Sequence, residues 1–245
     1  PLLMDRPLPF VSHLSALRKS LLVCLAALCA ATALCAPLAP RVLKILKIPA
    51  AGVVTQLYYF SPEEAFLVYM RIAFSCGLIA SLPVIIYSLW HFLAPAFSDR
   101  LRLRTGFFVA ASFLAFLAGN LFGYYLLLPS SLRFLLGVGN SELYPLLSAS
   151  RYISFVIGLI LACGVIFLMP VFIFFLARVG FVTAPFLRRR YPYALVVILI
   201  IAAIITPTTD VFNMLLVAAP MAALYEVSIW VAYFFGKGRL DGQVS

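Results

Sequence analysis

The chain is organised as six apolar segments separated by short polar stretches. They run over residues 21–36, 65–89, 105–128, 152–176, 193–205 and 211–235. A helix that crosses the hydrocarbon core of a bilayer takes about 20 apolar residues, within a range of about 17–25. Four segments meet this length, the first is slightly short, and the fifth is well short with 13 residues. The pattern predicts an all-α polytopic membrane protein with six transmembrane helices.

Composition supports lipid as the main solvent of this chain. Of the 245 residues, 65% are hydrophobic and 11% are charged, with a mean hydropathy of +1.12. A soluble domain carries about 25% charged residues. The net charge of +10 would favour nucleic acid as a partner of a soluble protein. Here the basic residues are shared among short loops, which favours membrane topology and argues against nucleic acid.

The basic residues also predict an orientation. Twelve Lys and Arg residues flank the segments on the side that carries both termini, against five on the other side. The positive-inside rule therefore places residues 1–20 and 236–245 in the cytoplasm. No internal repeat or low-complexity linker is visible. We expect residues 1–245 to form a single transmembrane domain.

The fifth segment is too short to cross an ordinary bilayer. At 1.5 Å per residue it reaches only about 20 Å, against a core of about 30 Å. Pro207 ends it, and Asp210 is a typical N-cap for the next helix. Two interpretations stay open: a short hairpin packed inside the bundle, or a face that thins the bilayer or accepts a partner.

Three strongly polar side chains fall within the apolar segments: Arg71, Asn120 and Glu226. Arg71 is close enough to the outer end of its segment for its side chain to reach the interface. Asn120 lies between Gly119 and Gly123, a spacing that permits close helix packing. Glu226 is either a hydrogen-bonded structural acid or a group that relays protons.

No enzymatic motif or metal-binding motif is present. The five cysteines lie in apolar segments, and neither histidine, His13 or His91, has a neighbouring carboxylate pair or thiolate. We therefore expect no catalytic residues, no metal and no cofactor. The function classes that remain are a membrane receptor, a scaffold and a translocation component.

Seven motifs, in order, resemble the TatC family, the core subunit of the twin-arginine protein translocase. They are "HLSALRKSL" (13–21), "SPEEAF" (61–66), "LPVIIYSLWHFLAPAF" (82–97), "GNLFGYYLLLP" (119–129), "YISFV" (152–156), "ITPTTDVF" (205–212) and "YEVSIW" (225–230). The resemblance implies six short, tilted helices in a glove-like concave bundle. It also implies a receptor that binds paired-arginine signal peptides of folded proteins. Such a receptor assembles with single-span TatA/TatB-like subunits and further copies of itself, and the proton gradient drives export.

The resemblance also assigns residues to two sites. Those implied for the signal peptide are His13, Leu17, Arg18, Phe92, Pro95 and Asp99. Those implied for partner helices are Ile204, Ile205, Thr206, Asp210, Asn213 and Met214. Two other functions stay open: a translocase-derived scaffold without transport activity, and a small-solute transporter that uses the polar groups within the spans.

The chain departs from the family pattern at three acidic positions. Ala16 and Leu101 stand where the family has the glutamates expected to bind the signal's guanidinium groups, and Leu168 replaces a third acid. A guanidinium favours a carboxylate partner because the two can pair bidentately. We hypothesise that Asp99 supplies a replacement carboxylate, with Asp5 as a second candidate. The alternative is that Asp99 is an ordinary loop or helix-capping acid.

Overall fold

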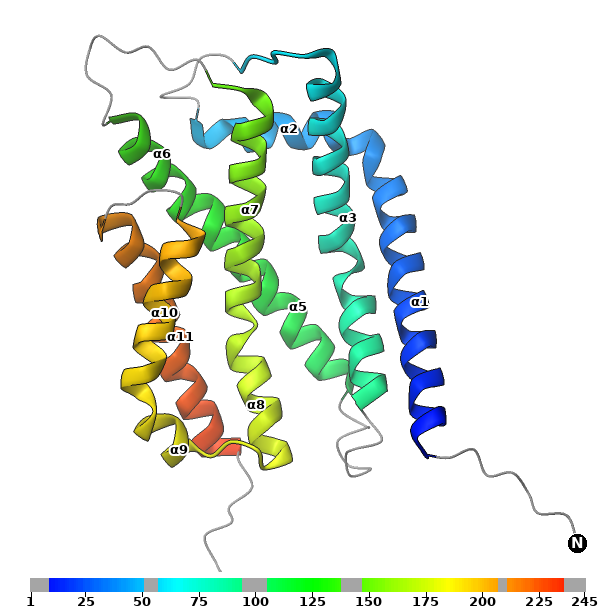
Figure 1. Cartoon of the computed structure of the whole chain (residues 1–245), viewed down its shortest axis with the longest axis vertical. Helices are drawn as coiled ribbons and strands as arrows, with labels where there is room; N and C mark the ends of the chain where they lie inside the picture. Colours follow the sequence, from blue (N-terminus) through cyan, green and yellow to red (C-terminus); the bar gives the residue numbers. More distant parts are fainter. Residues whose placement is uncertain (1–8, 51–56, 94–104, 138–146, 207–210, 236–245) are drawn as a thin grey trace, which may run out of the picture. The chain divides into compact units, whose positions relative to one another are not determined.

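The computed structural model describes residues 9–50, 57–93, 105–137, 147–206 and 211–235. These residues are almost entirely helical (Figure 1), and the single β-bridge among them joins Tyr58 to Ser148. The chain divides into two compact units. One comprises residues 1–42 with 69–113, and the other comprises residues 43–68 with 114–245. Each unit is described separately.

The helices follow one another with few interruptions. The first unit contains α1 (Pro9–Cys35), η1 (Ala36–Leu38), most of α3 (Pro62–Leu93) and the start of α5 (Thr105–Phe122). The second contains most of α2 (Ala39–Lys47), then η2 (Ile48–Ala50), the π-helical η4 (Gly123–Leu127), α6 (Leu128–Gly137) and α7 (Ala149–Phe167). It ends with α8 (Met169–Val179), α9 (Ala184–Arg189), α10 (Tyr191–Ile205) and α11 (Val211–Phe235).

Every predicted apolar segment coincides with helix in the structure. Five helical stretches are long and apolar enough to cross a membrane: Leu17–Lys47, Pro62–Trp90, Gly106–Leu135, Ala149–Arg178 and Met214–Phe234. The fifth predicted segment corresponds to α10, which has 15 residues and spans about 22 Å at 1.5 Å per residue. The prediction that the fifth segment is short is therefore confirmed.

Two helices lie where the sequence indicated only loops. In α2, Arg41, Lys44 and Lys47 recur every three residues, so their charges gather on one side of a short amphipathic helix. In α9, the Thr183 side chain accepts a hydrogen bond from the Phe186 amide, and a proline stands in the first turn. Both signals are readable in the sequence, but each helix is too short to appear as an apolar segment.

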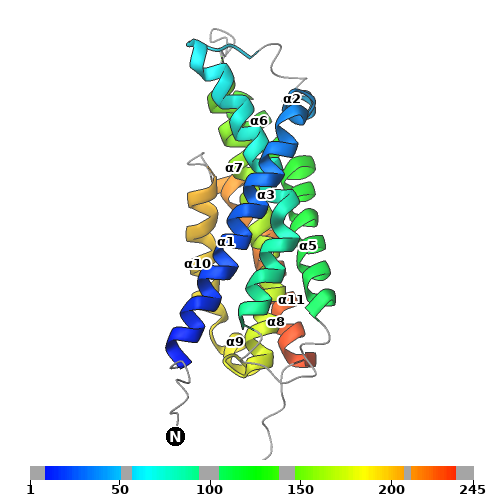
Figure 2. The ribbon, with the colours of Figure 1, turned by 90° about the vertical axis from the view of Figure 1, so that its right-hand side faces the viewer.

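In the first unit, α1 and α3 are antiparallel and in close contact (Figure 2). Gly77 on α3 lies directly against Thr32 on α1, where a Cβ on the glycine would lie 2.7 Å from the Thr32 Cα. Only a residue without a side chain permits this approach. Gly77 therefore sets the distance between the two helices.

In the second unit, α5 crosses α7 through small residues. A Cβ on Gly119 would lie 2.9 Å from the Gly164 Cα, and one on Gly123 would lie 3.2 Å from the Cys163 Cβ. Buried between them, Asn120 donates from Nδ2 to the Phe116 carbonyl at 2.7 Å. The predicted packing role of the Gly119–Gly123 spacing is confirmed, since both glycines face a helix of the same chain.

The fourth apolar segment is interrupted beside a proline. Leu168 separates α7 from α8, and Pro170 stands in the first turn of α8, where it offers no amide to the Ile166 carbonyl. Pro83 lies inside α3, which continues on both sides of it. The interruption at Leu168 divides the fourth segment into two helices with different neighbours: α7 packs against η4, and α8 packs against α11.

Two tyrosine side chains, one from η4 and one from α7, bind the end of α2 in the second unit. The hydroxyl of Tyr124 donates to the Ile45 carbonyl at 2.7 Å, and that of Tyr152 donates to the Leu46 carbonyl at 2.8 Å. These carbonyls belong to the last turn of α2, where a helix leaves its acceptors unsatisfied. The two tyrosines thus fix the end of α2 to η4 and α7.

Glu64, in the first turn of α3, connects two segments through hydrogen bonds. Its carboxylate accepts hydrogen bonds from the Phe60 amide at 2.8 Å, from the Ser150 amide at 3.0 Å and from the Ser148 hydroxyl. Beside it, the Tyr58 amide donates to the Leu147 carbonyl at 3.0 Å. One acidic side chain therefore joins the segment before α3 to the segment before α7.

Candidate functional site

The antiparallel course of α1 and α3 places the two motifs of the expected signal site at one end of the first unit. Thr32 and Gly77 mark the crossing. Counting back at 1.5 Å per residue, His13 lies about 28 Å along α1 from Thr32. Counting forward, Phe92 lies about 22 Å along α3 from Gly77 in the same direction. The start of α1 and the end of α3 therefore form the candidate signal site (Figure 1).

An aromatic stack fixes the end of α3. The rings of Trp90 and Phe108 lie 5.1 Å apart with an interplanar angle of 19°. Phe108 is buried at the start of α5, so the stack joins the two helices that flank residues 94–104. The sequence analysis did not identify this pair. An aromatic residue near each end of a connecting segment was the available signal.

The structure places only part of the predicted signal-peptide set. Leu17 and Arg18 lie on α1 with exposed side chains, Leu17 being 49% exposed. His13 also lies on α1, and Phe92 lies in the last turn of α3.

The remaining members of that set, Pro95 and Asp99, lie outside the described residues. Leu101, one of the two positions that lack the family's glutamate, does so as well. Ala16, the other such position, is part of α1. The hypothesis that Asp99 supplies a carboxylate thus stays a hypothesis.

The predicted partner-binding residues divide into exposed and buried members. Ile204 is 77% exposed and continues a stripe on α10 that includes Val196, Val197 and Ile200. Thr206 is buried, and its hydroxyl donates to the Ala202 carbonyl at 2.8 Å.

Two of the other four members have described side chains, Ile205 and Met214, and both are half-buried. Asn213 lies on α11, and Asp210 lies outside the described residues. The apolar stripe of α10 is thus exposed, whereas Thr206 is buried.

The three polar residues within the spans differ in burial. Arg71 is exposed on α3, as expected for a side chain that reaches the interface. Asn120 is 7% exposed, and its Oδ1 has no hydrogen-bond partner within the described residues. Glu226 is half-buried on α11, beside Tyr225, whose hydroxyl donates to the Leu187 carbonyl at 3.0 Å. They are distributed over three helices, α3, α5 and α11.

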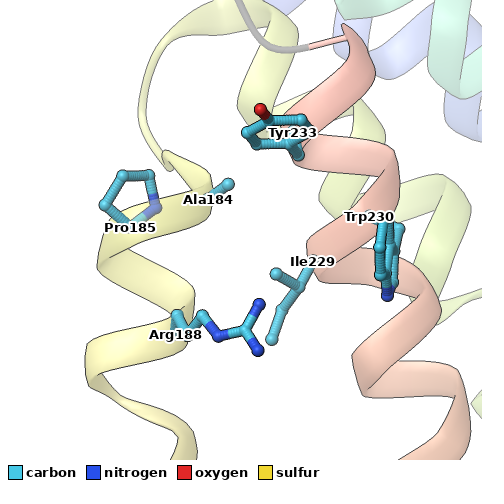
Figure 3. A pocket seen from close by; sticks show the side chains of 6 residues that line it. All are labelled: Ala184, Pro185, Arg188, Ile229, Trp230 and Tyr233. Atoms are coloured by element: carbon cyan, nitrogen blue, oxygen red, sulfur yellow. The ribbon is translucent and has the colours of Figure 1, made fainter.

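A basic cluster that the sequence analysis used only for topology has defined contacts. The Arg178 guanidinium lies 5.7 Å from the centre of the Phe174 ring, and that of Arg190 lies 5.5 Å from the Tyr193 ring. Arg188 instead lines a pocket with residues of α11 (Figure 3). No sequence pattern indicates this pocket, because its walls come from segments about 40 residues apart in the chain.

These features define a polytopic, all-α membrane protein whose conspicuous surfaces are helix ends and an apolar helix face. Residues 12–220 match the family described as Sec-independent protein translocase protein (TatC). The chain belongs to this family. It is accordingly a multi-pass membrane protein and a component of the Sec-independent protein translocase, and the family is not one of enzymes.

Relatives with the same description cover most of the chain. A TatC protein of Koribacter versatilis (strain Ellin345) is 42% identical over 190 residues, 77% of this chain and 70% of the relative. One of Carboxydothermus hydrogenoformans is 31% identical over 239 residues, 98% of both chains. A crystal structure described as the twin arginine translocase receptor TatC is 34% identical, with a TM-score of 0.78 over 90% of this chain and 97% of the other. The expected family and the all-α fold are confirmed.

Proposed function

We propose that the chain is the signal-peptide receptor of its translocase and binds paired-arginine signals at the start of α1 and the end of α3. The observation that carries the proposal is the antiparallel contact of Thr32 with Gly77, because it brings "HLSALRKSL" and residues 89–93 at the end of α3 to the same end of one compact unit. The Trp90–Phe108 stack holds the second motif on α5. The exposed side chain of Leu17 offers an apolar contact for the signal.

The experiment compares two signal peptides on one receptor. A photo-crosslinker replaces Leu17 on α1, and a control crosslinker replaces Tyr69, an exposed residue near the other end of α3. We expect a paired-arginine peptide to label position 17 and a paired-lysine peptide to label it much less, because lysine lacks the bidentate fork. Equal labelling by both peptides, or equal labelling at positions 17 and 69, would contradict the proposal.

A second experiment restores the family's carboxylates in the receptor and measures whether peptide affinity increases. A hydrogen bond to a charged group contributes about 1.5–3 kcal/mol, and solvent screening at an exposed surface favours the lower value. The double variant Ala16→Glu, Leu101→Glu should therefore bind the paired-arginine peptide at least about tenfold more tightly. Unchanged affinity would mean that the guanidinium groups bind elsewhere.

We also propose that single-span subunits dock on the apolar stripe of α10. The stripe is exposed, and α10 at about 22 Å is shorter than a bilayer core of about 30 Å. Ile204→Asp should prevent co-purification of these subunits. Val165→Asp is the matched control, since Val165 is an exposed apolar residue on α7. Loss of co-purification in both variants, or in neither, would contradict this docking face.

The proposed topology places both termini in the cytoplasm of a cell with an inner membrane. The excess of Lys and Arg on the side of the termini supports this orientation. We further propose that the receptor forms homo-oligomers within the complex and that the proton gradient drives export. Reporter domains fused after residue 245 and inserted at residue 142 should be active on opposite sides of the membrane, and activity on the same side would overturn the topology.

A further inference from the structure

A pocket opens between α9 and the last turns of α11. It has a volume of about 470 Å³ and is lined by Ala184, Pro185, Arg188, Ile229, Trp230 and Tyr233. Figure 3 shows the Arg188 side chain extending from α9 toward Ile229, while Tyr233 turns its hydroxyl toward α9. The walls are therefore apolar, with one cation and one hydroxyl group.

Arg188 differs from the neighbouring arginines that have aromatic partners. Arg178 lies over Phe174, and Arg190 lies over Tyr193. Arg188 is exposed, and no carboxylate lines the pocket among the described residues. Its charge is thus available to an anion that enters the space between α9 and α11.

The pocket also lies at the level of a membrane interface. Trp230 and Tyr233 occupy the last two turns of α11, at the end of the span Met214–Phe234, and both are exposed. Trp and Tyr concentrate where acyl chains meet headgroups, because one part of each side chain is apolar and the other hydrogen-bonds. A ligand of this pocket therefore faces hydrocarbon on one side and water on the other.

We propose that this pocket binds an anionic phospholipid, with Arg188 as the ligand of the headgroup phosphate. The acyl chains lie along Ile229 and Trp230, and the Tyr233 hydroxyl donates to the headgroup. A guanidinium binds phosphate through paired charge-assisted hydrogen bonds. Basic pockets between transmembrane helices are suited to anionic headgroups. The inference goes beyond signal recognition and does not depend on it.

The chain's own tail is a poorer occupant. Residues 236–245 follow α11 directly and contain Lys237, Arg239 and a single acid, Asp241. Their net positive charge opposes entry into a pocket that presents Arg188. Charge complementarity thus favours an external anion.

The test measures lipid binding to the full-length, delipidated protein by native mass spectrometry. Phosphatidylglycerol and phosphatidylcholine with identical acyl chains are titrated in separate arms. We expect phosphatidylglycerol to bind more tightly, because the choline cation of phosphatidylcholine opposes the Arg188 charge. Arg188→Gln should weaken phosphatidylglycerol about tenfold and weaken phosphatidylcholine less. Trp230→Ala should weaken both lipids, because it removes a contact with the acyl chains.

Arg189→Gln is the matched control. It removes the same charge from the neighbouring position, and Arg189 does not line the pocket. Equal losses in Arg188→Gln and Arg189→Gln would show diffuse attraction to a basic surface and overturn the site. So would equal affinity for the two lipids, or no effect of Arg188→Gln in a variant whose thermal unfolding matches that of the parent.

Two further arms exclude other occupants. An excess of inorganic phosphate should not displace phosphatidylglycerol, because phosphate lacks the acyl chains; displacement would make the site one for soluble phosphate. Removing residues 236–245 should leave the affinity unchanged. Tighter lipid binding by the shortened chain would identify the tail as the natural occupant.

Discussion

Thr32 on α1 and Gly77 on α3 are in direct contact, with no room for a side chain between the two backbones. A Cβ at position 77 would lie 2.7 Å from both the Cα and the amide nitrogen of Thr32, so relief requires a backbone shift. The contact fixes how closely the two helices approach. The proposed signal site lies at one end of this helix pair, so we expect it to depend on the contact.

Gly77→Ala should lower the stability of the protein by about 1–3 kcal/mol, the usual range for overpacking. The measurement is thermal unfolding in detergent. Gly158→Ala on α7 is the control, because a Cβ there meets nothing within 4 Å. We expect the control to retain the parental midpoint; an equal loss in both variants would show a general helix effect instead of a collision with Thr32.

Phe108→Ala should loosen the end of α3. In a water-soluble core this change costs about 3–5 kcal/mol, but here lipid solvates the freed surface, so we expect a smaller loss. Phe107→Ala is a close control, since Phe107 is 71% exposed and Phe108 only 7%. The measurement pairs thermal unfolding with peptide crosslinking at position 17. If both variants behave alike, the Trp90 stack does not position the site.

Tyr152→Phe and Tyr124→Phe each remove one hydrogen bond to a carbonyl in the last turn of α2. The loss should be about 1 kcal/mol for each variant, the net contribution of one hydrogen bond. The two hydroxyls bind adjacent carbonyls, Ile45 and Leu46, so the double variant should deviate from the sum of the singles. A double-mutant cycle on unfolding free energies measures this coupling, and strict additivity would show that the tyrosines hold α2 independently.

Glu64→Gln should weaken the connection between the segments before α3 and α7. The amide retains one acceptor oxygen, whereas the carboxylate serves three donors. Faster hydrogen exchange of the Tyr58 and Ala149 amides, which bond across the two segments, is the expected result. Glu63→Gln is the matched control at the adjacent residue. Unchanged exchange in Glu64→Gln would mean that the backbone bonds suffice.

The helices were predictable because apolar segments in a membrane protein admit few other structures. The helices α2 and α9 were not predicted. The signal for α2 is its amphipathic spacing and that for α9 is the Thr183 cap, and both are weaker in the sequence than a long apolar segment. The third segment extends beyond Leu128 into α6, and the π-helical turn Gly123–Leu127 stands directly before Pro129 within this continuous helical stretch.

The candidate site was predictable only in its motifs. "HLSALRKSL" and the end of α3 are recognisable in the sequence, but the contact that brings them together rests on a glycine and a threonine that no motif marks. The same holds for the pocket beside Arg188, whose walls are distant in sequence. The pattern of apolar and polar residues predicts the helices, but it does not predict which side chains of remote helices come into contact.

The interruption at Leu168 divides the fourth span into two halves with different main neighbours. Through Cys163 and Gly164, α7 contacts α5, whereas α8 packs on α11. Pro170 removes one hydrogen bond between the halves, while the Leu168 amide still donates to the Val165 carbonyl at 3.1 Å. We therefore expect the fourth span to bend at Leu168, so that one spectroscopic label on α7 and another on α8 report different motions during transport.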